Sequence, residues 1–376
     1  MGAPQPPGHA AIKVADWPAG DLAAYERACI PGSPFERGGA AARWRPASHK
    51  ALVSTYGRYL GYLAGQGVDL LGTSPVDRMT PERMVAYIRF LADRCASVTV
   101  SSYLGQLHMF ARDVWPERDW RWLCAMQAER HRMAEPVRIK AARIVPQQDL
   151  LRLGCDLMVK AEELETVEGD RVALERQAAL FRDGLVIALL ALRPLRQKNF
   201  LAIVIGRHLV DGPGGWTLVV PSSESKTHIE LRMAVPHILV PALQAYLKHH
   251  RPRLLEMRAP RDPVRPWRSP GQHLWIASTG MPMTPGALHK ALRRHTVARF
   301  GHEVNCHLFR DCLATSLADD NPEAVRLAAD LLGHRSFRTT AKHYIAANQK
   351  SALRRHQAGV AARRRETSRA DPGESR

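Results

Sequence analysis

Apolar residues recur at helical spacing throughout residues 46–134. The first such stretch places five of them on one helix face, namely Leu52, Tyr56, Tyr59, Leu60 and Leu63. A second stretch carries a helix start signal, because Thr80 can cap it and Pro81 fits the first helical position. Two further periodic stretches follow it. The pattern predicts a bundle of about four helices, in a first domain over residues 18–134.

The pattern of apolar positions changes in the second part of the chain. Helical periodicity over 147–163 and 176–192 gives way to shorter apolar stretches at 200–210, 216–222 and 228–236. Turn signals rich in Gly and Ser separate these three stretches, so they predict the strands of a small sheet. Helical patterns then return. The predicted fold class is mainly α with a small antiparallel β-sheet, in which a helical bundle precedes an α+β domain.

The composition of the two ends of the chain predicts where the folded domains begin and end. Residues 1–17 are rich in Pro and Gly and are expected to be disordered. The second domain is predicted over residues 147–350. A basic tail, residues 351–376, follows and is expected to be disordered beyond its first turns.

The chain is strongly basic. Its 376 residues include 54 Lys and Arg against 36 Asp and Glu, which gives a net charge of +18 and a pI near 10.2. This excess predicts a polyanionic partner, above all a nucleic acid bound with salt-dependent affinity. A membrane surface would also attract the charge, but no apolar run is long enough to span a bilayer and no signal peptide opens the chain. We therefore expect a soluble intracellular protein that does not use a membrane.

A basic connector is predicted between the two domains, over residues 135–146. It carries Arg138, Lys140 and Arg143, and its prolines discourage a continuous helix. This segment is either a solvated surface linker or a strap that contacts DNA.

The six cysteines are scattered along the chain without a CxxC pair. They are Cys29, Cys95, Cys124, Cys155, Cys306 and Cys312. This spacing argues against a zinc site or a disulfide framework, so reduced core thiols are expected.

Several residues could carry chemistry, although each has a plainer interpretation. His307 and Arg310 form an HxxR pattern, which on a helix puts both side chains on one face and could bracket a phosphate. Alone, such a pattern is more often an ordinary surface pair. His334 follows the helix-ending Gly333 and could be a simple cap, and Tyr344 ten positions later could be a packing residue.

Cleavage of DNA by a tyrosine without a metal has definite requirements. The phenol has a pKa of about 10 and must lose its proton as it attacks phosphorus. Arg side chains suit the developing charge, because one guanidinium binds two phosphate oxygens at once. A Lys or His must protonate the leaving 5′-oxygen. Two Arg, one or two His, a Lys and a Tyr around one phosphate would meet these needs.

The chain carries this set in the order Arg196, Lys226, His307, Arg310, His334 and Tyr344. In this succession the chain resembles the tyrosine recombinase (phage integrase) family. The catalytic domain of that family has an Arg after an apolar helix, a Lys in a β-hairpin, then HxxR, LGH and a Tyr about ten residues on. The resemblance covers residues 145–350 specifically. It extends more loosely to 46–134, which is similar to the family's helical, SAM-like core-binding domain.

The resemblance implies the bond-making roles. Tyr344 would be the nucleophile that forms a 3′-phosphotyrosyl bond. Lys226, which otherwise reads as an ordinary turn residue, would protonate the leaving 5′-oxygen. Because the phosphotyrosine keeps the bond energy, the resemblance implies that neither ATP nor a metal nor another cofactor is needed.

The remaining four residues would act on the phosphate. The resemblance implies that Arg196 and Arg310 hold its non-bridging oxygens. It also implies that His307 assists proton transfer and that His334 adds a hydrogen bond. The spacing of these residues would not by itself assign such roles.

Two positions depart from the family's pattern. The family usually has Glu three residues after the first Arg, where this chain has Asn199. That acid helps to orient the Arg, so Arg193 becomes a rival of Arg196 for the role. Asp311 stands where a His is common after HxxR, and an acid there could orient Arg310 or partly neutralise it.

The resemblance also implies the partners. Double-stranded DNA would lie between the two domains, contacted by the basic connector and by one basic helix that carries Arg293, Arg294 and Arg299. A solvated basic face is the alternative interpretation of that helix. Strand exchange implies a homotetramer on DNA, with a monomer or weak oligomer when free, and leaves open whether accessory proteins bend the DNA. The setting would be cytoplasmic and nucleoid-associated, in a bacterium or phage.

Three functions compete on these grounds. A site-specific recombinase or integrase of a mobile genetic element is favoured, because a helical domain precedes the second domain. A type IB topoisomerase would use similar residues to relax one duplex without strand exchange. A catalytically inactive DNA-binding protein would form no covalent adduct.

Overall fold

The computed structural model describes residues 10–33, 35–135, 140–165, 170–225, 228–256 and 271–320, with side chains at all of these except 140–141 and 319–320. The chain divides into two compact units, Met1–Ile139 and Lys140–Arg376.

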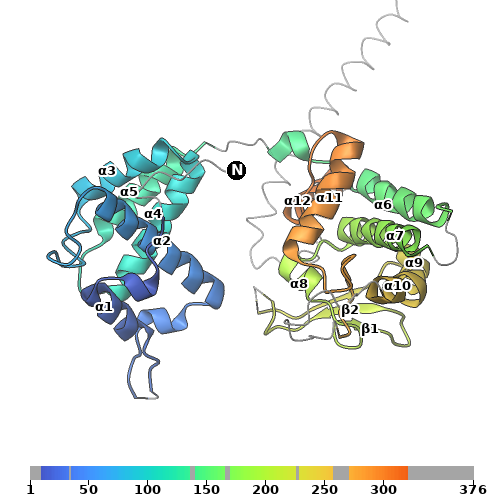
Figure 1. Cartoon of the computed structure of the whole chain (residues 1–376), viewed down its shortest axis with the longest axis horizontal. Coiled ribbons are helices and arrows are strands. Elements are labelled where there is room, and N and C mark those ends of the chain that lie inside the picture. Colours follow the sequence, from blue (N-terminus) through green and yellow to red (C-terminus); the bar gives the residue numbers. More distant parts are fainter. Residues whose placement is uncertain are drawn as a thin grey trace, which may run out of the picture. The chain divides into compact units, whose positions relative to one another are not determined.

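The described part of the first unit is a bundle of helices (Figure 1). They are α1 (Ala19–Cys29), α2 (Pro46–Gly65), α3 (Pro81–Ala92), α4 (Ser97–Val114) and α5 (Arg121–Arg132), with the 3-10 turns η1 (Val14–Asp16) and η2 (Ala40–Arg43). The predicted helical bundle is confirmed. Helix α3 also begins as predicted, because the Thr80 side chain accepts a hydrogen bond from the Arg83 N–H at 3.3 Å.

Aromatic rings fill the core of the first unit. Tyr56 stacks on Phe110 with ring centroids 4.3 Å apart, and Trp17 packs edge-on against both rings. The disorder expected over residues 1–17 is therefore wrong for residues 14–17, because residues 14–16 form η1 and Trp17 lies in the core. The Tyr56 hydroxyl donates to the buried Asp21, which also pairs with the buried Arg78 at 2.5 Å. Because both charges lie out of water, breaking this pair would leave one of them uncompensated. The pair therefore ties α1 to the loop that precedes α3.

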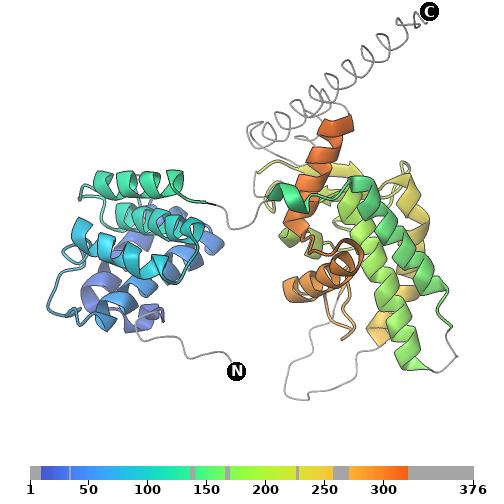
Figure 2. The same cartoon turned by 90° about the horizontal axis from the view of Figure 1, so that it is seen from above.

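The described part of the second unit is mainly helical (Figure 2). Its α-helices are α6 (Gln147–Glu162), α7 (Arg171–Leu192), α8 (Gln197–Leu201), α9 (Val240–Ala245), α10 (Arg251–Glu256), α11 (Pro285–Phe300) and α12 (Cys306–Asp320). The shorter helical turns are η3 (Lys140–Arg143), η4 (His237–Leu239) and the π-helix η5 (Tyr246–His250).

Helices α6 and α7 pack side by side through two glycines. A Cβ atom on Gly154 would lie 2.7 Å from the Gly184 carbonyl oxygen, and one on Gly184 would lie 2.6 Å from the Gly154 oxygen. These distances are too short for any side chain, so the glycines permit the close approach of the two helices. The approach fixes α7 firmly in the unit.

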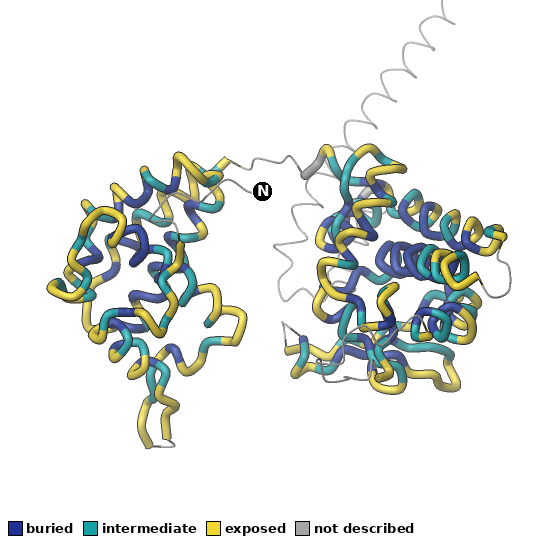
Figure 3. The backbone as a smooth tube through the Cα atoms, in the orientation of Figure 1, coloured by how far each residue is buried: buried dark blue, intermediate teal, exposed yellow. Residues whose placement is uncertain are grey.

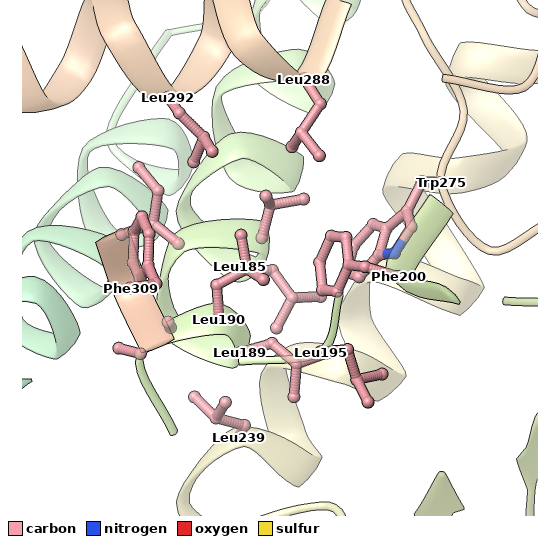
Figure 4. Close-up of a cluster of buried hydrophobic side chains, with 14 of the residues drawn as sticks. Leu185, Leu189, Leu190, Leu195, Phe200, Leu239, Trp275, Leu288, Leu292 and Phe309 are labelled. Atoms are coloured by element: carbon pink, nitrogen blue, oxygen red, sulfur yellow. The ribbon is translucent and has the colours of Figure 1, made fainter. Parts of the chain in front are cut away.

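Helix α7 supplies the centre of the hydrophobic core. Its residues 185–191 are all buried. Figure 4 shows Leu185, Leu189 and Leu190 pointing into a cluster that other elements complete. Phe200 of α8 stacks on Trp275 there, with ring centroids 4.9 Å apart. The end of α7 and the start of α8 are therefore anchored in the core, which holds the loop between them in place.

The sheet has three short antiparallel strands in the order β1-β2-β3. Strand β1 (Leu209–Val210) pairs with β2 (Thr217–Val220), and β2 pairs with β3 (Leu231–Ala234), with Leu218 opposite Met233. The predicted fold class, mainly α with a small antiparallel sheet, is confirmed. The strands predicted at 216–222 and 228–236 contain β2 and β3.

The strand predicted at 200–210 is wrong over most of its length. Only its last two residues form β1, and its first two residues belong to α8. The apolar side chains of Phe200 and Ile203 are buried in the hydrophobic core and not on a sheet face. A short, fully apolar run shows neither the period of a strand nor that of a helix, so periodicity alone could not assign this segment correctly.

Two arginines hold the described residues on either side of 257–270. Arg171 donates from Nη2 to the Glu256 carbonyl at 3.0 Å. Arg251 donates from Nε to the His273 carbonyl at 3.0 Å and from Nη2 to the Gly271 carbonyl at 3.1 Å. The chain therefore leaves α10 and returns to a residue of the same helix.

In both units the buried residues lie mainly on the helices that form the core (Figure 3). The middle of α7 is buried throughout, whereas the connecting turns are mostly exposed. Among the helices that the structure describes, none is long and apolar enough to cross a membrane.

Candidate functional site

The loop between α7 and α8 carries two arginines. It comprises residues 193–196, and its middle residues, Pro194 and Leu195, are buried. The Leu195 N–H donates to the Arg193 carbonyl at 2.7 Å, so the loop turns tightly. Arg196 then occupies the N-cap position of α8 with an extended backbone. Arg193 and Arg196 are consequently presented from a short, well-anchored turn.

The HxxR pair lies in the first turns of α12. The Asn305 side-chain oxygen caps this helix by accepting the His307 and Leu308 N–H groups at 3.1 and 3.0 Å. His307 is exposed, whereas Arg310 is only 7% exposed. The partial positive charge of a helix N-terminus also favours a bound anion near His307.

Arg310 joins α12 to the loop between α7 and α8. Its Nη1 donates to the Pro194 carbonyl at 2.6 Å. Burial and then the charge of Arg196 lower the pKa of Arg310 to about 10, against a smaller opposing effect of Asp311. Two guanidinium groups from distant parts of the chain are thus close enough to repel each other. This is an arrangement that a bound anion would stabilise.

The two candidate arginines of the loop differ in what they bind. Arg193 donates from Nε to the Ala234 carbonyl at 3.1 Å and from Nη1 to the Leu192 carbonyl at 2.9 Å. It therefore ties α7 to strand β3. Within the described residues, the half-buried Arg196 guanidinium has neither a hydrogen bond nor an ion pair, and burial lowers its pKa. The contacts favour Arg196 over Arg193 as the residue for a phosphate.

The two departures from the family pattern have definite places. Asn199 lies on α8 and is 9% exposed, so a neutral side chain occupies the buried position three residues after Arg196. Asp311 is adjacent to Arg310, and its charge acts to raise the pKa of that arginine. Asp311 is thus an acidic neighbour of the arginine pair, on the Arg310 side.

The turn between β2 and β3 is described up to Ser225 and again from His228. The Glu224 and Ser225 N–H groups both donate to the Pro221 carbonyl at 3.0 Å. Ser225 is buried, and His228 has a left-handed backbone with φ 55°. Lys226 itself lies outside the described residues.

Other predicted residues also lie outside the described part. They are Arg138, His334 and Tyr344, together with the side chain of Lys140. Of the six predicted catalytic residues, the structure therefore places Arg196, His307 and Arg310. It brings the two arginines together and sets His307 on the same helix as Arg310.

The described arginines predicted to bind DNA differ in what else they contact. The Arg143 guanidinium donates to the Glu303 carbonyl, so it holds the start of the second unit to the turn before α12. Arg294 pairs with Asp183 at 2.6 Å. Arg293 and Arg299 are exposed on α11. Of this group, these last two have side chains that remain available to a phosphate.

The cluster around Asp183 was not predicted from the sequence. This carboxylate is 1% exposed and accepts from Arg182, Arg294 and His295. Burial alone would raise the pKa of Asp183, but Arg182 and the His295 hydrogen bond outweigh it and lower the pKa. The sequence signal for this cluster is the adjacent pair Arg182 and Asp183 within the apolar second half of α7. Among the described residues, no cluster of three His, Cys, Asp or Glu could hold a metal ion.

Comparisons with known proteins give structural likenesses only. No family model matches the chain, and no curated protein sequence matches it. The XerH site-specific recombinase bound to its difH substrate is 14% identical, with a TM-score of 0.49 over 81% of this chain and 78% of that one. A lambda integrase dimer bound to a core site is 16% identical, with a TM-score of 0.47 over 81% and 90%. The Tn1549 transposon integrase in complex with circular intermediate DNA is 13% identical, with a TM-score of 0.45 over 83% and 95%. At these identities and scores, function is inferred from the chain's own residues.

Proposed function

We propose that this chain is a site-specific DNA recombinase that cleaves and rejoins DNA strands through a tyrosine. The single observation that carries the proposal is the pairing of Arg196 with Arg310. The two residues come from separate elements, and Arg310 Nη1 donates to the carbonyl of Pro194, two residues before Arg196, which brings the partly buried guanidinium against the loop that carries Arg196.

A phosphodiester is the ligand that this pair suits. Two neighbouring cations destabilise each other, and burial adds a desolvation cost to each charge. A phosphate oxygen pair offsets both costs, because guanidinium groups bind it through charge-assisted, often bidentate hydrogen bonds. His307, exposed on the first turn of α12, stands on the same helix as Arg310 and can reach an anion bound there.

The proposed reaction is an exchange of one phosphoester for another. The Tyr344 oxygen forms a bond to the scissile phosphorus, and its phenolic proton passes to His307. The bond from phosphorus to the 5′-oxygen breaks, and Lys226 gives that oxygen a proton. Arg196 and Arg310 stabilise the charge on the non-bridging oxygens, an effect worth most in a partly dry site. Rejoining is the same exchange in reverse, so the bond energy is kept and no ATP is needed. The arginine pair supplies the charge stabilisation, so the proposed reaction does not require a metal.

The proposal extends to DNA and to assembly. The exposed Arg293 and Arg299 of α11 are suited to phosphate contacts, and the +18 charge supports a polyanionic partner. Exchange between two duplexes needs four such sites, so the active form would be a homotetramer on DNA. Mobile-element integration is the favoured biological setting.

The test is covalent capture. The full chain is incubated with nicked duplexes of randomised sequence, which cannot religate once a strand is cut, and protein–DNA adducts are isolated under denaturing conditions and sequenced. We expect adducts with a common sequence. Tyr344→Phe should abolish them and leave DNA binding intact, whereas Tyr62→Phe, in the core of the first unit, should leave them unchanged.

Three outcomes separate the competing functions. Undiminished adduct formation by Tyr344→Phe would contradict the assignment of the nucleophile. No adduct with the unmodified chain would indicate an inactive DNA-binding protein. Relaxation of a supercoiled plasmid with one captured site, without exchange between two such sites, would indicate a topoisomerase.

A further inference from the structure

The first residues of the second unit run along helix α12. Val145 is buried and donates its N–H to Cys312 Sγ at 3.4 Å. The Gln147 N–H donates to Ser316 Oγ at 2.9 Å. As the chain advances from Val145 to Gln147, it therefore moves about one turn along α12 in the direction of that helix.

Gln147 bridges α12 and the end of α7. It is the first residue of α6, where an N–H group has no partner within its own helix, and Ser316 supplies that partner from α12. The Gln147 side chain reaches the other helix, because its Nε2 donates to the Ala191 carbonyl at 3.1 Å. Ala191 lies in the last turn of α7, where carbonyl groups also lack helical partners. One residue thus satisfies two helix ends and joins three helices.

The Gln147 bridge lies next to the candidate site. Its acceptor, Ala191, immediately precedes the last residue of α7, and the loop that carries Arg196 follows. Arg310 of α12 donates from Nη1 to the Pro194 carbonyl of that loop at 2.6 Å. The Gln147 bridge and the Arg310 hydrogen bond therefore connect α12 to the same short stretch of chain. Both contacts hold the helix of one candidate arginine against the loop of the other.

We propose that Gln147 is a positioning residue that holds Arg310 at the distance from Arg196 at which both guanidinium groups bind one phosphate. This inference rests on the proposed function, in which the two arginines bind the scissile phosphate. Neighbouring like charges repel each other, so the pair needs a tie that does not depend on a bound anion. The Gln147 bridge is such a tie, because it joins α12 to α7 through a neutral amide and uses no guanidinium atom.

The test measures single-turnover cleavage of the captured DNA sequence, together with DNA affinity. Gln147→Met removes the amide donor and keeps the neutral charge, the unbranched shape and the helix propensity of the side chain. Gln148→Met is the matched control, because Gln148 is the next residue of α6 and is exposed. A smaller folded fraction lowers the amplitude of single-turnover cleavage, whereas displaced arginines lower its rate constant. The two measurements therefore separate a loss of folding from a loss of position.

The expected results are specific to Gln147. Gln147→Met should lower the rate constant by roughly 10- to 100-fold, because a displacement of about 1 Å at a reacting group can cost on the order of 10²-fold in rate. DNA affinity should change little, since most of it comes from contacts to many phosphates. Gln148→Met should cleave at the rate of the unmodified chain. If Gln147→Met does not fold, Ser316→Ala decides, because it cuts the α12 side of the bridge and should also lower the rate constant.

A double-variant cycle with Arg310 separates a positioning role from a general structural one. In an Arg310→Ala background, Gln147→Met should cost less than in the unmodified chain, because the residue that it positions has been removed. Equal losses in the two backgrounds, or a normal rate constant for folded Gln147→Met, would overturn this inference and leave the arginine pair in place. Absence of any adduct with the unmodified chain would instead overturn the proposed function, and this inference with it.

Discussion

The Nη1 atom of Arg310 donates to the carbonyl oxygen of Pro194 at 2.6 Å, which fastens the first turns of α12 to the loop that carries Arg196. This hydrogen bond uses one edge of the guanidinium. Burial, and then charge repulsion from Arg196, lowers the pKa of Arg310 to about 10. The neutral Pro194 carbonyl thus holds the charged Arg310 guanidinium near the charge of Arg196.

The arginine pair should act as a unit in cleavage. Arg196→Gln and Arg310→Gln should each lower single-turnover cleavage by on the order of 10²–10³-fold, as loss of a transition-state hydrogen-bond donor does. Because both groups hold one phosphate, the double variant should lose less than the product of the single losses. Gln at 310 keeps an N–H group of the kind that Pro194 accepts. Strictly multiplicative losses would mean that the two residues do not share a ligand.

Arg193 provides the control for this pair. Its guanidinium is committed to the carbonyls of Leu192 and Ala234, so Arg193→Gln should lower the thermal unfolding midpoint more than the cleavage rate of the folded protein. A cleavage loss as large as that of Arg196→Gln, with unchanged stability, would show that Arg193 is the phosphate ligand.

Neighbouring arginines on α11 should differ in their effect on DNA binding. Arg293→Ala should weaken binding, and the slope of log affinity against log salt should fall by about 0.9 if one phosphate contact is lost. Arg294→Ala should change the slope little, because that guanidinium is bound to Asp183 at 2.6 Å. Affinity measured by fluorescence anisotropy at several salt concentrations gives both slopes. Equal slope changes for the two variants would contradict this assignment.

Asp183→Asn should destabilise the second unit. The change removes the negative charge that balances the buried Arg182, and breaking a buried pair typically costs about 3–5 kcal/mol. Urea unfolding followed by circular dichroism would measure this loss. Glu230→Gln, in an exposed pair with Arg232, should leave the midpoint nearly unchanged. A midpoint for Asp183→Asn equal to that of the control would show that the cluster contributes nothing to stability.

The cysteines should react with alkylating agents in an order set by burial. Burial raises the pKa of Cys306 to about 12 and that of Cys312 to about 11, whereas Cys124 is exposed. At pH 9 iodoacetamide should therefore modify Cys124 first, as mass spectrometry of peptides would show.

Unfolded thiols ionise near pH 9.0, so the folded chain binds more protons between pH 9 and 11. The free energy of unfolding should fall as the pH rises through that range. Equal labelling of Cys124 and Cys306 in the folded protein would contradict these shifts.

Local signals predicted much of the helical structure. The Thr-Pro pair at the start of α3 is capped as expected, with Thr80 accepting the Arg83 N–H group. Helix α11 begins in the same way, with Thr284 accepting the Ala287 N–H group. Such signals need only a few adjacent residues. The strand predicted at 200–210 was wrong because its apolar residues, such as Phe200 and Ile203, pack into the hydrophobic core of the second unit. The local pattern cannot distinguish that environment from the face of a sheet.

The contacts of the candidate site required the tertiary structure. Sequence order selected Arg196, His307 and Arg310, and the structure places the two arginines together. Sequence order could not show that the Arg193 guanidinium donates a hydrogen bond to strand β3, because the acceptor is the distant backbone carbonyl of Ala234. It also could not show that Arg294 forms an ion pair with Asp183, because these residues are distant along the chain and meet only where α7 and α11 pack together. His334 and Tyr344 lie outside the described residues, and their roles stay predictions.

The arginine fastenings at Glu256 and Gly271 have a practical consequence for labelling the protein. Arg171 and Arg251 hold the chain to the second unit at Glu256 and at Gly271, on both sides of 257–270. Each doubling of a flexible insert costs only about 0.6 kcal/mol in closure entropy. An epitope or a small fluorescent module spliced into this interval should leave the second unit folded, giving a reporter for single-molecule work without touching either terminus.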